Sequence, residues 1–104
     1  MYQKLGELEK KFEELGGRLS DPAVIKDNAL YQRLSRERAS LSALVETYRR
    51  YKKTKKELDD NKALLAEPDE EIRKMAKEEI TRETGSLQTL EKELKVLLLP
   101  KDPR

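Results

Sequence analysis

Several residue types that support common protein chemistries are missing from this chain of 104 residues. It has no cysteine, which excludes disulfides and thiolate chemistry. It has no histidine, the commonest general base and metal ligand. No apolar run is longer than four residues, as at 96–99, which is far too short to cross a membrane. We therefore expect a cytoplasmic protein that is not an enzyme, with no catalytic residue, cofactor, metal site, membrane contact or small-molecule substrate.

Bulky core-forming residues are also scarce. Aromatic residues make up 5% of the chain and charged residues 42%, so any hydrophobic core must be thin. Such a composition can indicate disorder, but here the net charge is only +2 and the apolar residues recur periodically. A highly charged chain with a helical period is typical of coiled coils and long helical hairpins.

Near the N-terminus, apolar residues alternate at spacings of three and four, as in a coiled-coil seam. They are Leu5, Leu8, Phe12, Leu15 and Leu19. We expect a helix over 2–17, ended by Gly16 and Gly17, because glycine readily adopts the left-handed cap. Asp21 before a proline predicts the start of a short helix near 21–26, and Asp27 offers a cap for the next helix.

A long second helix is expected over 28–66, because this stretch contains neither proline nor glycine. Its expected seam is Leu30, Leu34, Glu37, Leu41, Leu44, Tyr48, Tyr51, Lys55, Leu58, Lys62 and Leu65. Pro68 and the acidic residues after it predict the start of a third helix that ends near Leu99. One face of that helix would carry Ile72, Ala76, Ile80, Leu87, Leu90, Leu94 and Leu97.

The connection at 66–69 is short enough to make the second and third helices antiparallel. Because the first helix is much shorter than the second, we expect an all-α antiparallel helical bundle or coiled coil, in which a two-helix hairpin projects from a three-helix base. The helical domain would cover 1–99. Pro100 and Pro103 would open a linker over 100–104 to further domains, since proline does not continue a helix.

One basic cluster stands out in the second helix. Residues 28–66 contain ten basic and five acidic residues, a net charge of +5. Six cations fall within eight positions: Arg49, Arg50, Lys52, Lys53, Lys55 and Lys56. One interpretation is a surface that faces RNA phosphates. The other is pairing across the hairpin, where a tight turn would set Lys52 near Glu83 and Lys56 near Glu79. We expect Tyr48 and Tyr51 to pack in the seam rather than stack on bases.

Three stretches resemble the N-terminal domain of bacterial class I peptide chain release factors: residues 19–25, 31–37 and 45–52. This family contains two sister factors. Residues 98–103 are similar to the corresponding segment of the sister factor that acts at the stop codons UAA and UAG. The resemblance implies a non-catalytic, ribosome-binding helical domain near the stalk base of the large subunit and its rRNA. In the family, a Pro-Xaa-Thr tripeptide and a Gly-Gly-Gln loop carry codon reading and hydrolysis, and this sequence contains neither.

Two other interpretations explain a long two-stranded arm. A synthetase-like protein can use such an arm to grip tRNA, although this leaves the proline-rich ending unexplained. A structural or chaperone-like coiled coil would need an open apolar tip, whereas the segment 66–70 is polar.

Overall fold

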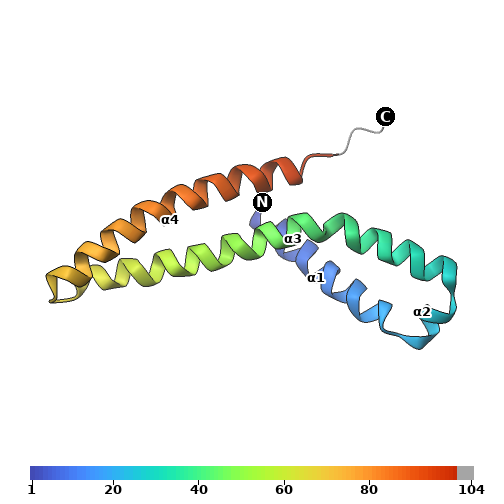
Figure 1. Ribbon diagram of the computed structural model, residues 1–104. Coiled ribbons are helices and arrows are strands. Elements are labelled where there is room, and N and C mark those ends of the chain that lie inside the picture. Colours follow the sequence, from blue (N-terminus) through green and yellow to red (C-terminus); the bar gives the residue numbers. More distant parts are fainter. Residues whose placement is uncertain (101–104) are drawn as a thin grey trace. The chain divides into compact units, whose positions relative to one another are not determined.

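The computed structural model describes residues 1–100 and shows only helices there (Figure 1). They are α1 (Tyr2–Leu19), α2 (Pro22–Lys26), α3 (Asn28–Ala63), the 3-10 helix η1 (Leu64–Ala66) and α4 (Glu70–Leu97). The expected all-α class is therefore confirmed. The chain divides into two compact units, one over 1–46 and one that begins at Thr47, and α3 belongs to both.

The first unit consists of α1, α2 and the beginning of α3. Its hydrophobic core is formed by Leu15, Val24 and Leu34, with Leu19, Leu30 and Leu41 packed partly against it. Both predicted caps are present. The Asp21 carboxylate accepts from the backbone N–H of Ala23 at 3.0 Å, and the Asp27 carboxylate accepts from that of Leu30 at 3.1 Å.

The predicted glycine stop of the first helix is wrong, because α1 continues to Leu19. No glycine within residues 1–100 has a positive φ, so Gly16 is an ordinary helical residue. The reason for a glycine there is the Arg38 side chain of α3. A Cβ on Gly16 would lie 3.1 Å from Arg38 Nε, which donates to the Phe12 carbonyl at 3.2 Å. The Arg38 guanidinium also lies 3.8 Å from the centre of the Phe12 ring.

The second unit is a helical hairpin. From Thr47 onward α3 runs to the tip, and α4 returns alongside it (Figure 1). The Asp69 carboxylate caps α4 by accepting from the backbone N–H of Glu71 at 2.9 Å. Arg73 closes the connection, because its Nη1 lies 2.7 Å from the carbonyl oxygens of both Glu67 and Pro68. The antiparallel pairing expected from the short connection is therefore present.

The buried stripe of α3 in this hairpin differs from the predicted seam at alternate positions. Lys55 and Lys62 are exposed, and the residues that turn inward lie one position earlier. The inward stripe is Thr47, Tyr51, Thr54, Leu58 and Asn61. On α4 the stripe is Ala76, Ile80, Glu83, Leu87, Leu90 and Leu94, whereas Ile72 and Leu97, at the two ends, are exposed. Both stripes keep the heptad period, and both include polar residues.

The register across the hairpin also differs from the tight-turn expectation. Asn61 bonds to Glu83 and Arg50 lies near Glu93, so each α3 residue meets a residue eight or nine positions further along α4 than predicted. The cause is the connection itself. Instead of turning sharply, the chain continues through η1, which packs against α4. The first turns of α4 therefore pair with the connection rather than with α3.

The predicted boundary at residue 99 lies close to the end of α4. The helix ends at Leu97 and Leu98 serves as its C-cap. Pro100 is in no regular element, and residues 101–104 of the expected linker lie outside the described part of the chain. The three-helix base would combine parts of both units and stays a prediction, as does a single domain over 1–99.

Candidate nucleic-acid interface

The six clustered cations lie on α3 in the second unit, and all six are exposed. Four of them follow the spacing i, i+3, i+4, i+7, which places them on one face of a helix. These four are Arg49, Lys52, Lys53 and Lys56, and we call them the basic stripe. At 100° per residue this face is opposite to the inward stripe that contains Leu58. The basic stripe extends over roughly 10 Å of helix at 1.5 Å per residue.

Arg50 and Lys55 lie on either side of the basic stripe. Arg50 Nη2 is 3.8 Å from a carboxylate oxygen of Glu93 on α4, and Lys55 Nζ is 3.5 Å from Asp59 on its own helix. The Arg50 side chain keeps 66% of its surface exposed. Exposed pairs of this kind are worth at most about 1 kcal/mol, so they can exchange for an external anion at little cost.

The two ion pairs expected across the hairpin are not formed, and that prediction is wrong. Lys56 Nζ instead lies 3.0 Å from Asp60, one helical turn along α3, and its side chain is 78% exposed. Lys52 Nζ lies 4.7 Å from the centre of the Tyr48 ring, a cation–π distance. The eight- to nine-residue difference in register explains both outcomes, because it moves Glu79 and Glu83 away from these lysines.

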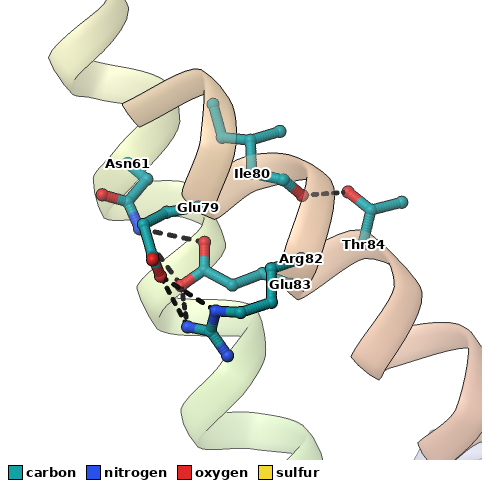
Figure 2. Close-up of polar contacts among 6 residues, drawn as sticks. All are labelled: Asn61, Glu79, Ile80, Arg82, Glu83 and Thr84. Atoms are coloured by element: carbon teal, nitrogen blue, oxygen red, sulfur yellow. Dashed lines mark hydrogen bonds and ion pairs between the residues drawn. The ribbon is translucent and has the colours of Figure 1, made fainter. Parts of the chain in front are cut away.

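Glu79 and Glu83 have other partners (Figure 2). Glu79 lies 2.6 Å from Arg82 Nη2, and this hydrogen-bonded pair raises the pKa of Arg82 above its usual value. Glu83 is 1% exposed and accepts from Asn61 Nδ2 at 2.9 and 3.1 Å. Both acidic side chains therefore have partners outside the basic cluster.

The aromatic residues of the cluster behave largely as expected. Tyr51 is half-buried in the inward stripe, in agreement with the seam prediction. Tyr48 is half-buried as well, with Lys52 over its ring. Neither tyrosine presents a free ring face comparable to the stacking platforms of single-strand binding proteins. Any RNA contact at this surface would therefore depend on charge.

Sequence reasoning missed the polar seam residues Asn61 and Glu83. A signal was available: Thr47, Thr54 and Asn61 are short, uncharged and spaced by seven, in a stretch where most neighbours are charged. Glu83 likewise stands seven residues after Ala76 and seven before Leu90. A heptad of small polar residues on one helix can face a polar residue on its partner, as polar residues at coiled-coil seams do.

Other kinds of site find no support in the part of the chain that is described. Residues 1–100 contain no group of three or more acidic side chains placed to hold a metal ion. Across the same residues, every helix is too short or too polar to serve as a membrane span.

Comparison with known proteins identifies the class. The PCRF domain family matches residues 8–104, and the chain belongs to this family. Two of the similar proteins are named peptide chain release factor 1. The chain is 46% identical over 104 residues to that of Clostridium botulinum strain Hall, and 48% identical over 103 residues to that of Nitratidesulfovibrio vulgaris strain DP4. The expected resemblance to release factors is confirmed.

Coverage of these relatives is unequal. Each match includes 99% of this chain but 29% of the relative, so the chain spans less than a third of the length of the curated proteins it resembles. No solved structure matches the chain.

Proposed function

We propose that this chain serves as the N-terminal, non-catalytic domain of a peptide chain release factor 1, within a protein that directs translation termination at UAA and UAG. Membership of the PCRF family and the named relatives support this assignment over a synthetase-like arm or a chaperone-like coiled coil. The sequence contains neither a Gly-Gly-Gln nor a Pro-Xaa-Thr motif. Peptide release and codon reading would therefore depend on the rest of such a protein.

In this proposal the domain contributes affinity for the ribosome, in the cytoplasm, at the stalk base of the large subunit and its rRNA. The observation that carries it is the basic cluster. In the alternative role these cations would pair across the hairpin; Arg50 does lie 3.8 Å from Glu93 on α4, but Lys55 and Lys56 pair with acids on their own helix. The six cations instead remain on the surface of α3 with exposed side chains. Phosphates provide most of the affinity of such a surface, in a manner that depends on salt.

Ribosome binding by the 104-residue chain tests the proposal. We expect the chain to co-sediment with large ribosomal subunits at low salt and to dissociate as the salt concentration rises. It should also compete with a full-length release factor 1 for ribosomes, and it should release no peptide from a stop-programmed ribosome. Absence of co-sedimentation at low salt would remove the ribosome-binding role. Peptide release by the chain alone would remove the non-catalytic one.

A further inference from the structure

A polar groove lies beside the basic stripe, between α3 and α4 of the second unit. Its volume is about 590 Å³, within the range of pockets that hold small ligands. From α3 it is lined by Arg50, Lys53, Thr54 and Glu57. Lys53 belongs both to the groove and to the basic stripe, so a strand held along the stripe would pass the mouth of the groove.

Some of the polar groups that line the groove are paired, since Arg50 lies 3.8 Å from Glu93 and the Thr89 hydroxyl donates to the Gly85 carbonyl at 3.2 Å, but others are not. Elsewhere on α3, charges four residues apart close into ion pairs, as Lys55 and Asp59 do at 3.5 Å. Lys53 and Glu57 have the same spacing but form no ion pair within residues 1–100. The half-buried hydroxyls of Thr54 and Ser86 likewise have no hydrogen-bond partner among the described residues. Lys53 and two hydroxyls are therefore available to a ligand, as is the Glu57 carboxylate, which also attracts the Arg82 guanidinium.

Gly85 supplies an independent observation. It lies in the interior of α4 and lines the groove, although glycine there costs about 1 kcal/mol relative to alanine. At Gly16 the Arg38 side chain explains the glycine, but a Cβ on Gly85 would meet nothing within 4 Å. Packing within the described chain therefore does not require a glycine at 85. A side chain there would extend into open space at the groove, where a ligand could approach the backbone.

From these observations we infer that the groove receives one unpaired nucleotide of an RNA strand that lies along the basic stripe, and that it prefers a base with an exocyclic amine. Arg50 and Lys53 would hold the phosphate, with Arg50 leaving its 3.8 Å contact to Glu93. The Glu57 carboxylate would accept from the amine, as acidic side chains do from cytosine N4. This inference rests on the proposed RNA-facing role of the basic cluster. It adds a base-reading site to that role.

Two homopolymeric RNA strands of equal length, one of cytidine and one of uridine, provide the probes. They carry the same phosphate charge, so the basic stripe binds both equally, whereas the groove distinguishes them. We expect the 104-residue chain to bind the cytidine strand roughly tenfold more tightly, the ratio that a contact to one base provides. Equal affinities for the two strands would overturn the inference. So would equally effective competition by a polyglutamate peptide, which would show that the groove accepts any extended anion.

Gly85→Leu tests the groove without touching a charge. Leucine is a better helix former than glycine, and a Cβ at this position meets nothing within 4 Å, so we expect the variant to fold at least as stably as the parent. We expect it to lose the preference for cytidine and to keep its affinity for a blunt RNA duplex, which only the basic stripe would bind. Retention of the preference in Gly85→Leu would contradict the inference.

Glu57→Ala separates base reading from simple charge. Removal of an acidic side chain next to Lys53 should strengthen binding of both strands, since it lessens repulsion of phosphate. The ratio of the two affinities should nevertheless fall toward one, because the acceptor for the amine is lost. A ratio that is unchanged would exclude Glu57 as the reader of the base.

The failure of this inference is distinguishable from the failure of the proposed function. If Lys52→Gln with Lys56→Gln weakens binding of duplex and single strands while Gly85→Leu has no effect, the stripe binds RNA and the groove does not. If neither strand nor the duplex binds at low salt, the RNA-facing role of the cluster fails, and the groove site with it.

Discussion

The amide of Asn61 on α3 meets both carboxylate oxygens of Glu83 on α4, at 2.9 and 3.1 Å (Figure 2). Glu83 is almost completely buried, and this contact, together with Arg82 Nη2 at 4.0 Å, accommodates an acid in a largely apolar seam. A slip of the hairpin by one heptad would place Glu83 opposite Thr54 or Pro68, neither of which has a side-chain amide. The Asn61–Glu83 pair therefore favours one register over its neighbours, a role that buried polar residues have in coiled coils.

Loss of Asn61 should destabilise the hairpin by leaving a buried carboxylate without its amide donor. We expect Asn61→Ala to lower the free energy of unfolding by roughly 1–3 kcal/mol, measured by urea denaturation. Lys62→Ala, one residue along and exposed, is the matched control and should change it by less than about 0.5 kcal/mol.

Replacement of both partners by leucine should be neutral or stabilising, because a buried polar pair exchanges for apolar contacts. The register should then become less unique. Spin labels at positions 56 and 88 of the Asn61→Leu, Glu83→Leu variant should give a broader distance distribution than the same labels in the parent. A sharp distribution in the double variant would contradict the role of the pair in setting the register.

Alanine should have opposite effects at different glycines. Gly17→Ala and Gly85→Ala should raise the free energy of unfolding by about 1 kcal/mol each, since both sites are helical and have open space for a Cβ. Gly16→Ala should gain less or destabilise, because its Cβ would press on the Arg38 guanidinium. In an Arg38→Ala background the difference between Gly16→Ala and Gly17→Ala should disappear. Persistence of that difference would mean that Arg38 is not its cause.

The Lys11–Glu37 ion pair should make stability depend on pH. Lys11 Nζ lies 2.8 Å from Glu37, and this hydrogen bond, helped by the attraction between the charges, lowers the pKa of Glu37. A lowered folded-state pKa contributes stability above the unfolded value of about 4.3, and that contribution is lost as the pH falls through the folded value. Thermal melts should therefore show Lys11→Met less stable than the parent at neutral pH and equal to it once the pH has fallen below the lowered folded-state pKa of Glu37.

Leu58 should matter more than its place in a thin hairpin suggests. A two-helix hairpin buries less than a bundle, yet Leu58 is 4% exposed while Leu41, in the first unit, is only partly buried. We expect Leu58→Ala to lower the free energy of unfolding by about 2–5 kcal/mol, and Leu41→Ala by less. Urea denaturation of the two variants side by side decides the order.

The sequence predicts the helices well because their signals are local. The Asp21 and Asp27 caps, the proline before α4 and the heptad spacing each depend on a few neighbouring residues. The predicted helix end at Gly16 is wrong, because the glycine there leaves room for the side chain of Arg38, which is distant in the sequence. A local pattern cannot reveal such a contact.

The candidate site is predictable only in part, for a related reason. Adjacent residues are enough to identify the basic cluster, but its ion pairs depend on the register of the hairpin. That register depends on how η1 packs on α4 and on the Asn61–Glu83 contact, and a change of eight or nine residues gives Lys56 a different partner. The groove near Gly85 depends on the same register, so the spacing of residues in the sequence does not disclose it.

The salt dependence of ribosome binding tests the central claim, that the basic stripe faces RNA. The comparison is between Lys52→Gln with Lys56→Gln on the stripe and Lys74→Gln with Lys92→Gln on α4, which removes the same charge from exposed positions elsewhere. We predict that the stripe variant weakens binding and reduces the slope of log affinity against log salt by about one unit for each lost phosphate contact. The α4 variant should leave that slope unchanged. Equal slopes for the parent and both variants would show that the stripe is a solvated helix face.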